Sequence, residues 1–248
     1  MKKTFKRLIL MIQFFTTIPI PVQIECDNED FGKGLVFAPI VGLMIGGILL
    51  GTYKLFILFL PIQVAIVFNM LIYFIITGGL HLDGLADTFD GIFSGRPKKR
   101  ILEIMSDSRI GTYGVLVLIG VIISDLVLLG NINANVLPIA FLLTPVAGRI
   151  GSLISAGVSS YAREDGLGKS FIGFCHIKEL IIGIFISFII FYIFLGLYGV
   201  IIVFIVNMTA LLLTYILTRK IGGATGDILG AICELNQLVF LLIVLLMI

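Results

Sequence analysis

Three aspartates and a histidine directly follow a long apolar run, within the segment His81–Gly91. Asp83, Asp87 and Asp90 are spaced four and three positions apart, so on a helix their side chains project from one face. Three negative charges on one face repel one another unless a cation lies between them, and carboxylate oxygens are the ligands that Mg2+ prefers. The spacing therefore predicts a Mg2+ site and chemistry on a phosphate. The competing interpretation is a solvated helix start whose aspartates are favoured by the helix dipole.

His81, two positions before Asp83, is the candidate general base. Imidazole has an unperturbed pKa of about 6.5, which suits the removal of a proton from an attacking hydroxyl group. Two positions along a helix correspond to about 200°. We therefore expect His81 to reach the nucleophile only if the helix begins after it. The alternative is a histidine that caps the helix or supports a metal ligand.

Polar residues recur where other apolar runs begin or end. Arg109 can hold a phosphate through two parallel hydrogen bonds, and backbone N–H groups around Gly222 and Gly226 can cradle one. Helix capping and plain loop connection are the alternatives for these segments. The candidate substrate-binding residues are Asp107, Ser108, Arg109, Arg149, Arg163, Thr225, Asp227 and Glu234.

Arg149, Glu234 and Asp125 differ from the others because they lie inside apolar runs. A charged side chain in hydrocarbon is costly unless it is paired or hydrated. We expect Arg149 to contact an anion or to pair with an acidic residue, and Asp125 to have a structural partner.

The composition indicates a membrane protein. Of 248 residues, 59% are hydrophobic and 13% are charged, against about 45–50% and about 25% in soluble domains. The net charge of +2 gives no basis for a nucleic-acid partner. Cys26, Cys175 and Cys233 lack zinc-site spacing and are expected to be free thiols.

Seven apolar segments reach the roughly 20 residues that a membrane crossing requires. The expected fold is all-α: one polytopic helical bundle over residues 1–248, with an additional interfacial helix within residues 5–22. The seven segments are 36–60, 62–80, 112–130, 136–159, 179–196, 198–218 and 228–248.

Charge in the connecting segments alternates along the chain. Loops with lysine and arginine alternate with short gaps that carry no charge. By the positive-inside rule, the charged loops near residues 81–111, 160–178 and 219–227 are cytoplasmic and form the active site. The protein is then a multi-pass protein of the cell membrane.

The motifs, in order and over nearly the whole chain, resemble those of the cobalamin 5'-phosphate synthase family. The His81–Gly91 segment is the most specific match, and Gln237 stands where the family usually has a second glutamate. The other matching stretches are Phe14–Pro21, Pro39–Gly42, Asp107–Gly114, Arg163–Gly168 and Gly222–Ala231.

The resemblance implies a Mg2+-dependent phosphoryl transfer at the membrane. Adenosylcobinamide-GDP and α-ribazole, or its 5'-phosphate, would give adenosylcobalamin, or its 5'-phosphate, and GMP. The implied partners are these small molecules and membrane lipids, together with a second copy of the chain or other cobalamin-assembly enzymes.

Two other classes share part of the pattern. A lipid phosphotransferase of the CDP-alcohol type would use similar metal chemistry. A transporter would place polar groups at mid-membrane between two related halves.

Overall fold

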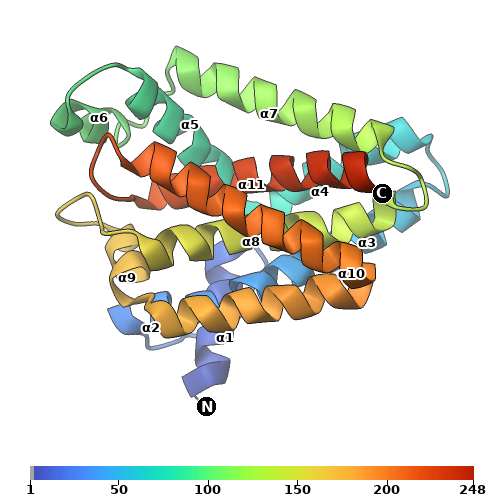
Figure 1. The fold of residues 1–248 in the computed structure, drawn as a ribbon, viewed down its shortest axis with the longest axis horizontal. Helices are drawn as coiled ribbons and strands as arrows, with labels where there is room; N and C mark the ends of the chain where they lie inside the picture. The colour runs from blue at the N-terminus through green and yellow to red at the C-terminus, as the bar shows by residue number, and fades with distance from the viewer. Residues whose placement is uncertain (1–2) are drawn as a thin grey trace.

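The computed structural model describes residues 3–248, which form eleven α-helices, one 3-10 helix and no β-strand (Figure 1). The all-α prediction is confirmed for these residues. The helices are α1 (Lys3–Phe15), α2 (Asn28–Gly34), η1 (Leu35–Phe37), α3 (Ala38–Phe56), α4 (Ile62–Thr77), α5 (Leu80–Phe93), α6 (Lys98–Ile104), α7 (Thr112–Asn131), α8 (Leu137–Val158), α9 (Leu167–Phe174), α10 (Ile177–Thr218) and α11 (Gly226–Met247).

The lengths and hydropathy of these helices define a multi-pass membrane protein. Within the described residues, five helical stretches are long and apolar enough to cross a bilayer, and α4 with α5 adds a sixth if that bent pair is one span. The predicted count of seven and the interfacial character of α1 stay predictions. The five stretches are Asn28–Phe56, Thr112–Asn131, Leu137–Val158, Ile177–Thr218 and Gly226–Met247.

Helix α10 consists of two halves that meet at Gly196. A continuous helix of its 42 residues would be about 63 Å long, roughly twice the hydrocarbon thickness of a bilayer. At Gly196 the backbone has φ 59° and ψ −137°, and the chain turns back in Figure 1. A side chain at Gly199 would overlap the carbonyl of Phe191. The predicted segments 179–196 and 198–218 correspond to these two halves.

The joint between α4 and α5 corrects one predicted boundary. The segment predicted to continue to residue 80 ends at Thr77, because Gly78 and Gly79 have φ angles of 62° and 69°. This left-handed conformation is accessible to glycine at little cost. The helix axis bends by 87° there, and α5 begins at Leu80.

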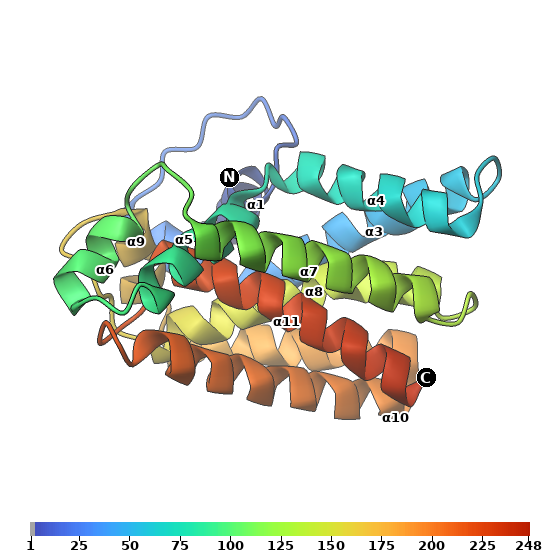
Figure 2. The same ribbon diagram turned by 90° about the horizontal axis from the view of Figure 1, so that it is seen from above.

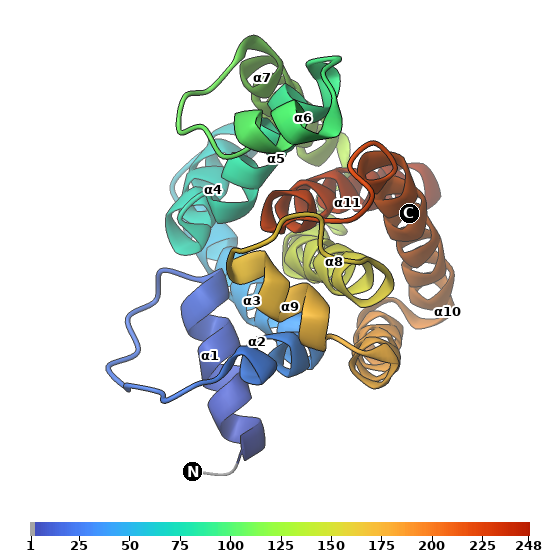
Figure 3. The same ribbon diagram turned by 90° about the vertical axis from the view of Figure 1, so that its left-hand side faces the viewer.

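Helix α8 lies at the centre of the bundle (Figure 3), and most of its residues are buried. Small residues let its neighbours approach closely, as is common between membrane helices. A Cβ added to Gly42 of α3 would lie 2.7 Å from the carbonyl oxygen of Pro145 in α8, and one added to Gly151 would lie 3.1 Å from Asn236 of α11.

The N-terminal helix α1 is fixed to the bundle by buried charge. Asp30 of α2 is fully buried and forms ion pairs with Lys6 at 2.9 Å and with Arg7 at 2.9 Å. Beyond α1, Thr17 donates from its backbone N–H to the carbonyl oxygen of Ile76 at 2.7 Å. The helix is thus held at both ends.

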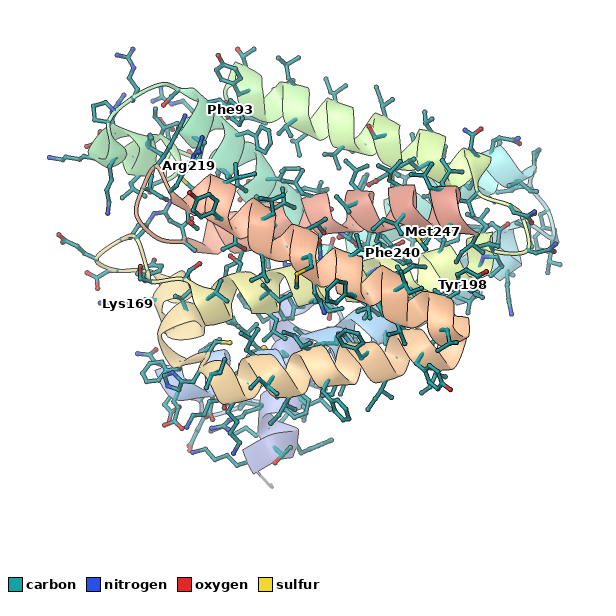
Figure 4. All side chains as sticks on the ribbon, in the orientation of Figure 1. Phe93, Lys169, Tyr198, Arg219, Phe240 and Met247 are labelled. Atoms are coloured by element: carbon teal, nitrogen blue, oxygen red, sulfur yellow. The ribbon has the colours of Figure 1, made fainter. Side chains whose placement is uncertain are left out.

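The charged connecting segments gather at one end of the bundle. Helices α5, α6 and α9 and the loop from α10 to α11 lie together at the left of Figure 1, at the same end in Figure 2, and facing the viewer in Figure 3. Lys169 and Arg219 lie at this charged end in Figure 4, whereas Tyr198 and Met247 lie toward the opposite end.

Candidate active site

A cleft of about 240 Å3 opens at the charged end, lined among others by Asp83 of α5, Arg163 of the loop before α9 and Asp227 of α11. Glycines bring α5 and α11 into backbone contact there. A Cβ added to Gly84 would lie 2.8 Å from the carbonyl oxygen of Asp227, and one added to Gly230 would lie 3.2 Å from the Cα of His81. This close approach brings two acidic residues 144 positions apart in the sequence into one cleft.

Arg163, Thr225 and Asp227, all predicted from sequence, lie together. The Arg163 guanidinium donates to Asp227 Oδ2 at 2.7 Å. Thr225 caps α11 by accepting the N–H of Ile228 at 3.3 Å. The backbone N–H of Ala224 donates to the Ser160 carbonyl at 2.8 Å, which joins the two loops that carry these residues.

The three aspartates of α5 differ in exposure: Asp83 is exposed, Asp87 is half-buried and Asp90 is buried. Asp87 does not line the cleft, but its carboxylate is repelled by Asp83, Asp227 and Asp90 and attracted by Arg163. Carboxylates therefore outnumber the guanidinium group in this region, and their oxygens are the ligand type of a hard divalent cation. In the described residues, the ligand oxygens of Asp83, Asp87 and Asp227 do not all lie within 4.8 Å of one another.

Asp90 has a visible structural role. Its two oxygens accept the backbone N–H of Gly111 at 2.6 Å and that of Gly114 at 2.8 Å. A side chain on either glycine would overlap the carboxylate. Asp90 thus fastens α5 to the start of α7, and its assignment as a metal ligand stays a prediction.

Asp107, Ser108 and Arg109 do not line the cleft. Asp107 and Arg109 border a separate pocket of about 260 Å3, which they share with Asp90, and Ser108 is exposed. Arg109 donates to both Asp107 oxygens, at 3.0 and 2.7 Å. This neighbouring guanidinium lowers the pKa of Asp107 to about 2. Asp107 and Arg109 thus form an ion pair with each other at the surface.

Arg149 and Glu234 lie in a buried cluster with Tyr73 and Gln237, rather than in the cleft wall. Tyr73 donates its hydroxyl hydrogen to Glu234 Oε1 at 2.7 Å, and Arg149 donates to the Tyr73 hydroxyl oxygen at 3.3 Å. Gln237 donates to Glu234 Oε2 at 3.0 Å. Arg149 thus reaches Glu234 only through the Tyr73 hydroxyl, and its Nε and Nη2 have no hydrogen-bond partner in the described residues. Both roles predicted for Arg149, contact with an anion and pairing with an acidic residue, stay predictions.

His81 lies between this cluster and the cleft. The condition set for His81 as a base, that the helix begins after it, is not met, because Gly78 and Gly79 complete the turn earlier and α5 starts at Leu80. His81 is buried yet borders the cleft. Its Nδ1 is 4.0 Å from Glu234 Oε1 and has no hydrogen-bond partner in the described part of the chain.

Sequence reasoning missed two groups of residues near the site. Tyr73 and Gln237 both donate hydrogen bonds to Glu234. A tyrosine in an apolar run gives no sign of such a contact. The only sign in the sequence is that Gln237 lies one helical turn after Glu234. Phe14, Phe15 and Phe171 line the cleft as well, although α1 and α9 are distant in sequence.

Fold and site together define a multi-pass helical membrane protein with a carboxylate-rich cleft at one end of its bundle. The sequence profile of cobalamin-5-phosphate synthase matches residues 7–245, so the chain belongs to that family. This membership confirms the predicted resemblance and the prediction of an enzyme, a transferase of cobalamin synthesis.

Relatives with assigned names support the same family. A protein of Clostridium acetobutylicum named adenosylcobinamide-GDP ribazoletransferase is 53% identical, covering 97% of this chain and 96% of its own length. A protein of the same name from Acetivibrio thermocellus is 52% identical, covering 97% and 98%. No solved structure shows significant similarity to the chain.

Proposed function

We propose that this enzyme joins adenosylcobinamide-GDP to α-ribazole, or to α-ribazole 5'-phosphate, with release of GMP, in the cleft of Asp83, Arg163 and Asp227. The names of its close relatives support the substrates. The observation that carries the location is the convergence of two acidic segments and one guanidinium on a single cleft.

The proposed reaction is a phosphoryl transfer. A ribazole hydroxyl oxygen forms a bond to the phosphorus attached to cobinamide, the bond from that phosphorus to the bridging oxygen breaks, and GMP leaves with that oxygen. The hydroxyl proton is released. Arg163, held by Asp227 at 2.7 Å, is oriented to contact a phosphate oxygen.

The charge of the site supports a requirement for Mg2+. An anionic pyrophosphate is repelled by a cleft in which carboxylates outnumber guanidinium groups, unless cations enter with it. Asp83, Asp87 and Asp227 are the residues that would hold Mg2+, with Asp90 as the further candidate. When bound, the ion would neutralise charge on the transferred group and the leaving group.

His81 is the proposed acceptor of the hydroxyl proton. Although His81 lies inside α5, the residue borders the cleft, which supports this role despite the helical offset from Asp83. Its ring packs against Phe15 at a centroid distance of 5.6 Å. Glu234 lies behind it. In the alternative role, His81 supports the wall of the cleft.

We further propose that the charged end faces the cytoplasm and that the loops near 81–111, 160–178 and 219–227 form the active site there. The basic residues of these loops support this through the positive-inside rule. With Cys26, the exposed native cysteine, replaced by serine, a cysteine at Asn133 should react with an impermeant reagent from outside, whereas one at Lys98 should not. Labelling at Lys98 from outside would reverse the orientation.

The activity is tested with purified protein in detergent. Adenosylcobinamide-GDP, α-ribazole and Mg2+ are supplied, and GMP release and the mass of the corrinoid product are measured. Release of GMP with joining of the two substrates supports the proposal. Absence of product with Mg2+ in excess contradicts it, and transfer to a lipid alcohol from a CDP-alcohol donor would favour the lipid phosphotransferase class.

A further inference from the structure

The cleft has two chemically different sides. Asp83 and Asp227 come from α5 and α11, whereas Phe14 and Phe15 of α1 and Phe171 of α9 supply three aromatic rings. In Figure 3, α1 and α9 lie on one side of this end of the bundle and α5 and α11 on the other. The aromatic side has no part in the phosphoryl transfer proposed above, so its chemistry requires its own explanation.

The three rings are in mutual contact but not coplanar, since Phe14 is inclined by 74° to Phe15 and by 46° to Phe171. The ring centroids of Phe14 and Phe171 are 4.5 Å apart, and those of Phe14 and Phe15 are 5.2 Å apart. Phe15 and Phe171 are each 3% exposed, whereas Phe14 is half-buried. Two rings are therefore held in place by packing, and the third leaves part of its surface free. The half-exposed Phe14 ring, with its tilted neighbours, can take a planar aromatic ring in offset or edge-to-face contact.

Two hydroxyl groups beside this aromatic wall, defined as Phe14, Phe15 and Phe171, already donate within the protein, whereas Nδ1 of His81, whose ring packs on Phe15, has no partner in the described part of the chain. Ser152 donates its hydroxyl hydrogen to the Leu229 carbonyl at 2.9 Å, and Tyr161 donates to the Asp165 carbonyl at 3.0 Å. A guanine edge presents donors and acceptors that lose hydrogen bonds when buried without partners. An aromatic ring with an apolar edge loses none.

The wall is also held in position before any substrate binds. Ion pairs of Lys6 and Arg7 with buried Asp30 fix α1 to α2. Helix α2 packs directly against the end of α9, since a Cβ added to Gly32 would lie 2.6 Å from the Cβ of Phe174. Phe14 and Phe171 are therefore kept in register although they belong to different helices, which reduces the ordering cost of binding.

We propose that Phe14, Phe15 and Phe171 form the recognition surface for the aromatic base of the ribazole substrate, and so determine specificity for it. This inference rests on the proposed function, because it places one of the two proposed substrates. It gives α1 a role in substrate selection.

The wall is tested through the separate KM values of the two substrates. Phe14→Ala and Phe171→Ala should raise the KM for α-ribazole on the order of 10-fold, as expected for loss of base–aromatic stacking, and leave that for adenosylcobinamide-GDP unchanged. Phe14→Tyr should restore the wild-type value because it keeps a stacking ring. Phe31→Ala is the matched control, since Phe31 packs on Phe171 at 5.4 Å but does not line the cleft.

Three results would overturn the assignment. One is an unchanged KM for α-ribazole in both alanine variants; another is an increase in the KM for adenosylcobinamide-GDP instead, which would assign the wall to guanine. The third is an increase in the KM for α-ribazole in Phe31→Ala as large as in the other two alanine variants. That result would show that the wall contributes only to packing.

Equilibrium dialysis with α-ribazole alone separates this inference from the proposed activity. Binding by the wild-type protein that Phe14→Ala weakens supports the wall even if no turnover is detected. Equal binding by both proteins contradicts the wall even if turnover is normal.

Discussion

Asp227 and Glu234 lie seven residues apart on α11, about 10 Å along its axis, and their surroundings are opposite. Asp227 belongs to an open cleft where carboxylates outnumber guanidinium groups. Glu234 is 2% exposed, accepts hydrogen bonds from Tyr73 and Gln237, and has Arg149 in the same cluster. The comparison teaches that an acidic side chain is available for chemistry where negative charge is in excess and reachable. Where an acidic side chain is buried and accepts hydrogen bonds from neighbouring helices, it holds those helices together.

The sharpest test of this comparison is removal of negative charge from Asp83 in the cleft and from Asp87 beside it. Asp83→Asn and Asp87→Asn should each lower turnover on the order of 1000-fold or more, a magnitude known for charge-stabilising groups in phosphoryl transfer. Membrane insertion and stability should stay at the wild-type level. GMP release is measured at limiting and at excess Mg2+. Asp165→Asn is the control, because the Asp165 side chain is 97% exposed. Near-normal turnover of both variants at limiting Mg2+ would remove Asp83 and Asp87 from the metal site.

Substitutions in the buried cluster of Arg149, Tyr73, Glu234 and Gln237 should mainly lower the stability of the protein, whereas those in the cleft lower its turnover. Arg149→Met removes the buried guanidinium that is linked to Glu234 through the Tyr73 hydroxyl, and a buried charge left uncompensated costs up to about 3–5 kcal/mol. Unfolding of the purified protein by denaturing detergent should report this loss. The double variant Arg149→Met with Glu234→Gln should regain part of the stability. If the single variant unfolds like the wild type, the two groups are not coupled.

Asp90 belongs to the aspartate triplet of α5, but its hydrogen bonds to α7 predict a structural role like that of Glu234. Asp90→Asn keeps one acceptor but turns an amide toward the second backbone N–H, at Gly111 or Gly114. An unsatisfied buried donor costs about 1–3 kcal/mol, so the variant should lose stability more than turnover. Thermal unfolding and GMP release, measured on the same sample, show whether the variant loses more stability or more turnover. Loss of turnover at full stability would instead establish Asp90 as a metal ligand.

Gly84→Ala tests whether contact between α5 and α11 sets the geometry of the cleft. The added methyl group would lie 2.8 Å from the Asp227 carbonyl oxygen, and overpacking of this kind costs about 1–3 kcal/mol. A reduction of turnover by about 10-fold is expected as the helices separate. Gly120→Ala is the matched control, because no atom lies within 4 Å of its Cβ position. Equal activity of the two variants would show that the cleft tolerates the shift.

The sequence was sufficient for most helices and for the core of the cleft. The predicted segments 112–130 and 136–159 match α7 and α8 closely, because hydropathy depends on local composition. Arg163 and Asp227 were predicted from their own segments, and they meet at 2.7 Å.

The rest depends on tertiary contacts that no local pattern encodes. The bond from Tyr73 to Glu234 joins residues 161 positions apart. The aromatic wall combines helices near residues 14 and 171. The short α4 follows from two left-handed glycines, which hydropathy averages do not register.

The buried cluster also has a consequence for biogenesis. During translation, Arg149 is synthesised 85 residues before Glu234, an interval of roughly 4–17 s at about 5–20 residues per second. A lone arginine at mid-membrane costs about 2.5–3.5 kcal/mol on insertion, and Tyr73 alone offers it no charge. Nascent chains that stop before α11 therefore retain an unmatched cation at the centre of the bundle. Helix α11 brings Glu234 and Gln237 to Tyr73 and so completes the polar cluster around Arg149.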